Sequence, residues 1–263
     1  MLSGKGVKAQ FAIDTGMNRI GLDADDVNFC ERIIRQCNNQ YELTGIFTHL
    51  CVLDTATDES RKFTEQQISK FCNVADRGND LNLPYVHCYN SAGGLYHGIK
   101  DNIGKIIRLG IVLYGLKPDY NNLLPVGIKP AFSWKSVVSM IKKLRPGESV
   151  GYGNTFIANR EMKIATIPTG YADGYRRELS NKGYVLIKGY KSPIIGRVCM
   201  EQMMVAITDI EVKGLNISVG DEVILIGGNE ERQITTDYIV ALIGTIGYEI
   251  VCGISKRVPR LYT

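Results

Sequence analysis

In the first 120 positions, short continuous apolar runs alternate along the chain with longer amphipathic segments. Four short continuous runs have the length of buried strands, at residues 9–14, 43–50, 85–88 and 106–109. The amphipathic segments between them predict helices, one starting after Asp23 as its N-cap and one over about residues 58–74. The apolar stripe of the first helix consists of Val27, Cys30, Ile33 and Ile34. This alternation predicts right-handed β-α units around a parallel sheet.

A polar or charged side chain stands at or near the end of each predicted strand: Asp14, His49, Asn90 and Arg108. In β/α barrels the active site lies at the C-terminal ends of the strands, so these side chains are the first candidates for a site. Residues 90–94 are expected to form a turn beside them. A closed barrel has eight β/α units, and the pattern here predicts four. The region therefore has the pattern of half a barrel.

After residue 120 the pattern changes to short strands separated by turn signals. The clearest strand runs are 163–168, 184–187 and 222–226, and the clearest turns are at 145–147 and 227–229. One helix is predicted over about residues 235–243. The predicted fold class is α/β plus β: the C-terminal half of a β/α (TIM-type) barrel over residues 1–122, followed by a mainly β domain over 123–263.

Composition narrows the classes of function. The chain has 263 residues, 44% hydrophobic and 22% charged, with a net charge of +4, as in an ordinary globular protein. No basic run with interleaved aromatic residues occurs, which argues against a nucleic-acid partner. Seven cysteines show no paired metal spacing, so we expect no metal site and a reduced, cytoplasmic compartment. We expect neither a signal peptide nor a membrane segment in this sequence.

Eight separated stretches together resemble the alanine racemase family. They are IDTGMNRIG (13–21), GIFTHL (45–50), VHCYNSAG (86–93), IIRLGIVLYGL (106–116), LRPGESVGYGNTF (144–156), IPTGYADGYRR (167–177), PIIGRVCMEQMMV (193–205) and TIGYEI (245–250). Their number, order and spread over both predicted domains make the resemblance specific. It implies a barrel that binds pyridoxal 5'-phosphate (PLP), a β domain, and a homodimer whose sites are shared between subunits.

The resemblance also implies an activity: interconversion of L- and D-alanine, which supplies D-alanine for peptidoglycan. In the family, the lysine that binds PLP lies on the first barrel strand in a KANAYGHG-like motif, and no such motif occurs in this sequence. We expect the chain to enter the family fold just before the fifth strand. We also expect the 263-residue chain to be inactive by itself.

Racemisation requires two bases that flank the substrate Cα. By resemblance, Tyr152 is the base contributed by the partner subunit. A free phenol has a pKa near 10 and must be poised by its neighbours. His49 and Arg108 match the residues that do this in the family, and Arg108 also matches the contact to the PLP ring nitrogen. Because an arginine does not give up its proton, it would leave that nitrogen unprotonated.

The resemblance assigns the cofactor phosphate to a set of backbone and hydroxyl donors. Ser91, Gly110 and Ile111 match its ligands, Asn90 is their neighbour, and Tyr248 matches a tyrosine from the β domain. A helix cap is the alternative for Asn90 and Ser91, and the two roles are compatible.

Four residues match substrate contacts by resemblance: Arg19, Met200, Tyr171 and Glu201. Arg19 addresses the substrate carboxylate and the cofactor phenolic oxygen, and the Met200 backbone N–H meets that carboxylate. Two positions depart from the family. Ala12 stands where many members carry a carbamylated lysine that braces the arginine, so Arg19 needs another brace, such as a bound anion. Glu201 replaces the usual aspartate at the substrate entrance.

Three alternatives to an alanine racemase stay open. One is a catalytically inactive protein of the same fold that lacks the PLP lysine, and another is a serine-preferring racemase. The third is a fold-related PLP decarboxylase, against which the set of Tyr152, Met200 and the GYADG stretch argues. His87 and His97 have no assigned role and are expected to be structural or surface residues.

Overall fold

The computed structural model describes residues 7–55, 57–97, 103–104, 106–118, 124–211, 214–229 and 231–262. The chain divides into two compact units, residues 1–128 and 129–263, which are described separately. The boundary predicted at 122/123 falls within residues 119–123, outside the described residues, and the division observed lies six residues further on.

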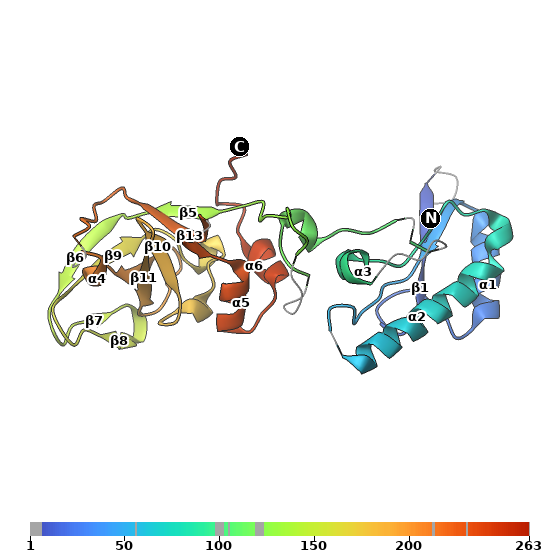
Figure 1. Ribbon diagram of the computed structural model, residues 1–263, viewed down its shortest axis with the longest axis horizontal. Helices are drawn as coiled ribbons and strands as arrows, with labels where there is room; N and C mark the ends of the chain where they lie inside the picture. The colour runs from blue at the N-terminus through green and yellow to red at the C-terminus, as the bar shows by residue number, and fades with distance from the viewer. Residues whose placement is uncertain are drawn as a thin grey trace. The chain divides into compact units, whose positions relative to one another are not determined.

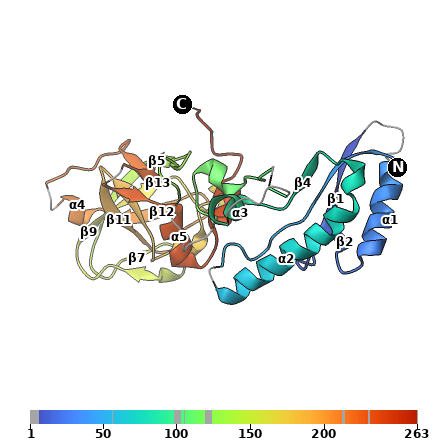
Figure 2. The same cartoon turned by 45° about the vertical axis from the view of Figure 1, so that its right-hand side comes forward.

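The first unit contains a four-stranded parallel sheet in the order β2-β1-β3-β4. Its strands are β1 (Lys8–Asp14), β2 (Leu22–Asp23), β3 (Glu42–Phe47) and β4 (Tyr85–His87). Its helices are α1 (Val27–Asn38), α2 (Asp58–Arg77) and α3 (Ser91–Tyr96). Figures 1 and 2 show α1 and α2 beside each other, where Arg35 of α1 pairs with Asp80 just after α2. The parallel β-α arrangement predicted from the apolar pattern is confirmed.

Three local predictions for this unit were wrong. The cap of α1 is Asp26, whose carboxylate accepts from the Phe29 N–H, whereas Asp23 lies in β2. Residues 91–96 form the helix α3 rather than a turn, with Asn90 as its cap. Residues 106–109 form no regular strand and make a single bridge, between Asn90 and Arg108.

The second unit is a curved β structure with two helices at one end (Figure 1). Eight strands form one sheet, in the order β14-β13-β10-β11-β12-β9-β6 with β5 also paired to β13. They are β5 (Trp134–Val137), β6 (Met140–Leu144), β9 (Met162–Ile167), β10 (Tyr184–Ile187), β11 (Tyr190–Ile195), β12 (Met203–Ala206), β13 (Glu222–Gly228) and β14 (Gln233–Ile234). A separate hairpin joins β7 (Ser149–Val150) to β8 (Phe156–Ile157). The helices are α4 (Thr208–Glu211), α5 (Thr236–Ile243) and α6 (Gly247–Gly253).

Each unit has its own apolar core. In the first, Ile13, Ile46 and Phe71 bring β1, β3 and α2 together. In the second, Trp134 packs edge-on against Tyr175 among the inward-facing residues of the large sheet. Among the described residues no single helix is long and apolar enough to cross a membrane; α5 and α6 reach that length only together, across a bend of 105°.

Candidate functional site

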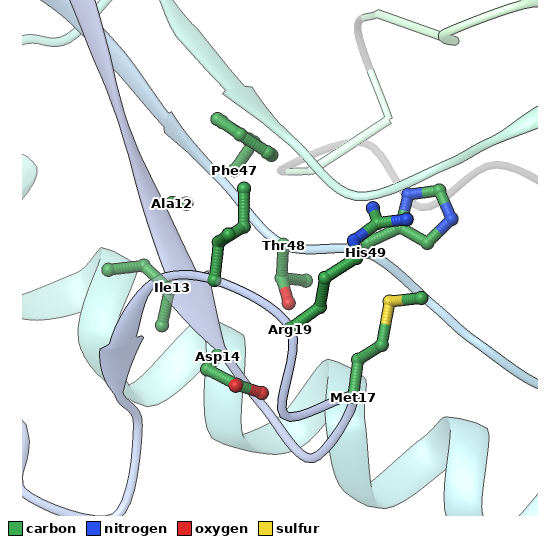
Figure 3. Close-up of a pocket in the computed structure, with 9 residues that line it drawn as sticks. Ala12, Ile13, Asp14, Met17, Arg19, Phe47, Thr48 and His49 are labelled. Atoms are coloured by element: carbon green, nitrogen blue, oxygen red, sulfur yellow. The ribbon is translucent and has the colours of Figure 1, made fainter.

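In the first unit the candidate residues gather at the C-terminal ends of β1, β3 and β4. A pocket there is lined by the tip of β1 and the end of β3: Ala12, Ile13, Asp14, Met17, Arg19, Ile20, Phe47, Thr48 and His49. Figure 3 shows the Arg19 side chain extending toward the His49 ring. The loop that carries Arg19 is held by Asp14, whose carboxylate accepts from the N–H groups of Gly16 and Asn18.

Arg108 is the centre of this cluster. Its Nη1 lies 2.6 Å from Nδ1 of His87, and its Nη2 lies 3.4 Å from Nδ1 of His49. Nη2 also donates to the backbone carbonyls of Thr48 and Cys88, at 2.8 and 3.2 Å. The ring of Phe47 lies beneath the guanidinium, 5.4 Å from it. One cation thus ties the ends of β3 and β4 together.

The partners of Arg108 are neutral acceptors. Within the described residues no acidic side chain pairs with it, although it is partly buried. Burial lowers the pKa of Arg108 below its ordinary value, but a guanidinium still stays protonated at working pH. An uncompensated cation of this kind favours a ligand that carries acceptor atoms or negative charge.

Both histidines beside Arg108 are held neutral. Burial, and then the charges of Arg108 and Arg19, lower the pKa of His49. Burial and Arg108 lower the pKa of His87 to about 4. His87 Nε2 lies 2.9 Å from Oε1 of Gln10, so the proton sits on Nε2 and Nδ1 accepts from Arg108.

His87 is therefore a member of the site cluster that the sequence reasoning left without a role. Its place at the end of β4, next to the strand that leads to His49, was an available signal. His97 packs against the Tyr89 ring at 6.4 Å and does not belong to the cluster.

Arg19 and Ala12 line the same pocket. Ala12 contributes only a methyl group, and in the described part of the chain no hydrogen bond or ion pair joins Arg19 to another side chain. The sequence predicted that another group must hold Arg19 in place of the lysine that Ala12 replaces. No protein group among the described residues does so. An anion in the pocket stays a prediction.

The candidate phosphate ligands lie close together. Ser91 is buried at the start of α3, and its Oγ accepts from the Gly110 N–H at 2.8 Å. Asn90 caps α3 and also donates to the Leu50 carbonyl at 3.0 Å, so the capping alternative is correct for it. Among the described residues, a Cβ on Gly110 would meet only the Ser91 hydroxyl, at 3.7 Å, which leaves open space beside this backbone. This open space beside small residues fits a phosphate, for which the Gly110 N–H would exchange its bond to Ser91 Oγ.

The second unit carries its candidates on exposed turns. Tyr152 is 70% exposed, Met200 54% and Tyr171 43%. Tyr152 lies between Gly151 and Gly153, which both have positive φ, so the sequence GYG forms a tight turn that displays the phenol. Tyr248 is in the first turn of α6.

Met200 lies in the turn closed by the hydrogen bond from Cys199 N–H to the Gln202 carbonyl. Its carbonyl accepts from Ala172, whereas no acceptor for its own N–H is present among the described residues. A free backbone donor at this place is what the predicted contact to a substrate carboxylate requires. Glu201 is paired with Arg257 at 2.9 Å.

Comparison with known proteins places both units in one family. The family model described as "Alanine racemase, N-terminal domain" matches residues 2–118, and "Alanine racemase, C-terminal domain" matches residues 131–262. A protein of Halothermothrix orenii named "Alanine racemase" is 42% identical over 258 residues, which are 97% of this chain and 65% of the relative.

Solved structures give the same result. The alanine racemase of E. faecalis superposes with a TM-score of 0.88 at 34% identity, over 99% of this chain and 67% of that one. The alanine racemase of Bartonella henselae, a structure with covalently bound pyridoxal phosphate, has a TM-score of 0.82 at 30% identity, over 98% and 67%. This chain thus spans about two thirds of the length of the proteins it matches. The barrel-half and β-domain fold class predicted from the sequence is confirmed.

Proposed function

This chain belongs to the alanine racemase family, and from that premise we propose that it forms most of a PLP-dependent racemase that interconverts L- and D-alanine. The observation that carries the proposal is Arg108, a partly buried cation whose partners among the described residues are all neutral, set between two neutral histidines at the C-terminal strand ends. Alanine is the substrate in the names of the relatives, and nothing in the comparisons favours serine. Peptidoglycan supply and a cytoplasmic location go with that role.

The residues present fit PLP. Ser91 and the backbone at Gly110 and Ile111 would hold its phosphate, Tyr248 would add a hydroxyl, and Arg108 would donate to its ring nitrogen. When bound, the cofactor stabilises the negative charge left at the substrate Cα after proton removal. Because Arg108 keeps its own proton, the nitrogen would stay unprotonated and that stabilisation would be moderate.

The chain's own groups divide the remaining work. Arg19 and the Met200 N–H would bind the substrate carboxylate, and the Tyr152 hydroxyl would move the proton on one face. His49, held neutral, offers the hydrogen-bonding group through which Arg108 would influence that phenol. Tyr171 and Glu201 would border the substrate entrance.

We propose a homodimer in which the β-rich unit of one subunit completes the site of the other. Tyr152, Met200 and Tyr171 stand exposed on turns of their own unit, which suits groups that serve a partner's pocket. None of the seven cysteines, all within the described residues, forms a disulfide, which agrees with a reduced compartment.

The direct test supplies what this chain does not span. The unmatched part of the H. orenii relative, which would bring the cofactor lysine, is fused ahead of residues 1–263; we call the product the complemented chain. We expect it to bind PLP and convert L-alanine to D-alanine, whereas residues 1–263 assayed by themselves form no D-alanine. Arg108→Gln in the complemented chain is expected to abolish turnover. A complemented chain that folds and binds PLP without racemising alanine contradicts the proposal.

A further inference from the structure

Three segments of the β-rich unit meet around the candidate substrate residues. We call them the entrance junction: 170–174 (GYADG), the turn 199–202, and 253–257, which begins with the last residue of α6. The first two are joined by backbone hydrogen bonds from Tyr171 N to Cys199 O (3.0 Å) and from Ala172 N to Met200 O (2.9 Å). The third is joined to the first by the bond from Ser255 N to Asp173 O, at 2.9 Å.

Two glycines allow the backbones to come this close. A Cβ on Gly170 would lie 2.2 Å from the Cys199 carbonyl oxygen, and one on Gly174 would lie 2.2 Å from the Gly253 carbonyl oxygen. Gly174 also has φ +101°, in the region that favours glycine. The junction is therefore a packed meeting of three backbones, and a displacement of one segment is transmitted to the next.

One side chain spans all three segments. Arg257 places Nε 3.1 Å from Oδ1 of Asp173 and Nη2 2.9 Å from Oε1 of Glu201. The other oxygen of Asp173 accepts from the Gly170 N–H at 2.8 Å. The guanidinium of Arg257 thus fixes the carboxylate that closes the GYADG turn, and at the same time holds the residue next to Met200.

The base of Arg257 is itself well held. Its N–H donates to the Ser255 hydroxyl, and Arg260 donates to the Ser255 and Ile254 carbonyls, at 2.7 and 3.0 Å. The hydrogen bond to Glu201 and the charge of Asp173 raise the pKa of Arg257, which therefore stays charged. An isolated surface ion pair is worth little. This pair differs in that one partner, Asp173, has a side chain only 13% exposed.

We propose that Arg257 is a positioning residue of the racemase, which sets the free Met200 N–H against Tyr171 so that a substrate carboxylate is received between them. The proposal rests on the function proposed above. It also gives a reason for Glu201, where the family usually has aspartate: the longer side chain reaches Arg257 at 2.9 Å, and a side chain shorter by one methylene would not without movement.

The first measurement uses residues 1–263 as they are and needs no activity. Amide hydrogen exchange is followed by NMR at Tyr171 and Ala172, whose N–H groups bond to the 199–202 turn. We expect Arg257→Gln to speed this exchange on the order of tenfold, because charge-assisted bonds to two carboxylates are lost. Arg257→Lys should restore part of the protection, and Glu201→Asp should give a smaller acceleration. The control is Arg160→Gln, which removes the 2.7 Å pair with Asp209 in the same unit and should leave both amides unchanged.

The second measurement is the KM and kcat of the complemented chain for L-alanine. A misplaced carboxylate donor weakens substrate binding, so Arg257→Gln should raise KM about five- to tenfold and leave kcat within about twofold. Unchanged exchange, or faster exchange with unchanged KM, overturns the proposal. If the unsubstituted complemented chain has no racemase activity, the proposed function fails and the positioning proposal fails with it. The exchange result then still shows whether Arg257 joins the segments.

Discussion

The two units of this chain present their site residues in opposite ways. In the first, Arg108, His49 and His87 are at least partly buried at the ends of parallel strands, and Arg108 is hydrogen-bonded to both histidines. In the second, Tyr152, Met200 and Tyr171 stand exposed on turns whose shape is set by glycines and backbone bonds. The difference indicates a division of labour. The first unit holds its cation and neutral histidines in place without a ligand, and in the function proposed above the exposed groups of the second unit would serve a partner subunit's site.

Two buried polar side chains, one in each unit, differ in their hydrogen bonding. Gln67, fully buried on α2, donates to the Thr15 hydroxyl and the His49 carbonyl and accepts from the Cys51 N–H. Ser192, fully buried on β11, has a hydroxyl with no hydrogen-bond partner among the described residues. A satisfied network rigidifies the strand ends that carry the site, whereas an unsatisfied buried hydroxyl lowers the stability of its unit.

Of the further substitutions that compare the two units, one in the exposed half of the site should have the largest effect. In the complemented chain, Tyr152→Phe is expected to lower racemisation at least 100-fold, because phenylalanine keeps the ring but has no transferable proton. PLP binding should be unchanged, since Tyr152 is not among the groups that would hold the cofactor. The measurement is solvent-deuterium incorporation into each alanine enantiomer, alongside PLP titration.

Tyr262→Phe, at another exposed tyrosine of the same unit, is the matched control and should be silent. If Tyr152→Phe incorporates deuterium into both alanine enantiomers at the rates of the unsubstituted chain, Tyr152 is a surface residue and not a base.

The next effect concerns the buried half. Gln67→Leu removes four hydrogen bonds, one each to Thr15 and His49 and two from Cys51, and should destabilise the first unit by about 2–3 kcal/mol. Segment-resolved hydrogen exchange should show the loss in β1, β3 and α2. The single tryptophan, Trp134, is buried in the second unit, so its fluorescence transition in urea should not move. Equal losses in both units would show that the two do not differ as described.

Lowering the pH should also reduce the free energy of unfolding of the first unit more than that of the second. Because the folded pKa of His87 is about 4 and that of His49 is also lowered, the unfolded chain binds protons first as the pH falls below about 6.5. Stability of the first unit should therefore fall by about 1–2 kcal/mol between pH 6.5 and 4, and level off below that.

The pKa values of Asp80 and Asp221 are lowered from their ordinary value, so these two carboxyl groups do not titrate between pH 6.5 and 4. Hydrogen exchange at several pH values tests the prediction, and His87→Gln should flatten the slope. An equal slope in the β-rich unit would count against it.

The smallest effect is expected at Ser192. The Ser192 hydroxyl is buried and has no hydrogen-bond partner among the described residues. Ser192→Ala removes this desolvated polar group and should stabilise the second unit by up to about 1 kcal/mol. The Trp134 fluorescence transition in urea is the measurement. A clear destabilisation would mean that the hydroxyl is bonded in solution, for example to water.

Much of the architecture was determined by the sequence alone. Apolar runs of strand length predicted β1, β3, β4, β9, β10 and β13, and the segment from Thr235 predicted α5. These predictions succeed because burial of one face of a strand or helix requires apolar residues at regular spacing in the sequence. The motif-bearing residues His49, Arg108, Ser91 and Gly110 were also found, and the structure brings them to one edge of the sheet.

Other features were decided only by tertiary structure. The choice of Asp26 over Asp23 as helix cap depended on β2, where Asp23 pairs with β1, and residues 106–109 had strand-like composition but make only one bridge. The partners that place the site residues are equally hidden: Gln10 meets His87 across 77 positions, Gln67 meets Thr15 across 52, and Arg257 meets Glu201 across 56. Local pattern records which face of a segment is buried. Which polar group from a distant segment ends beside it depends on chain crossings, and those carry no periodic signal in the sequence.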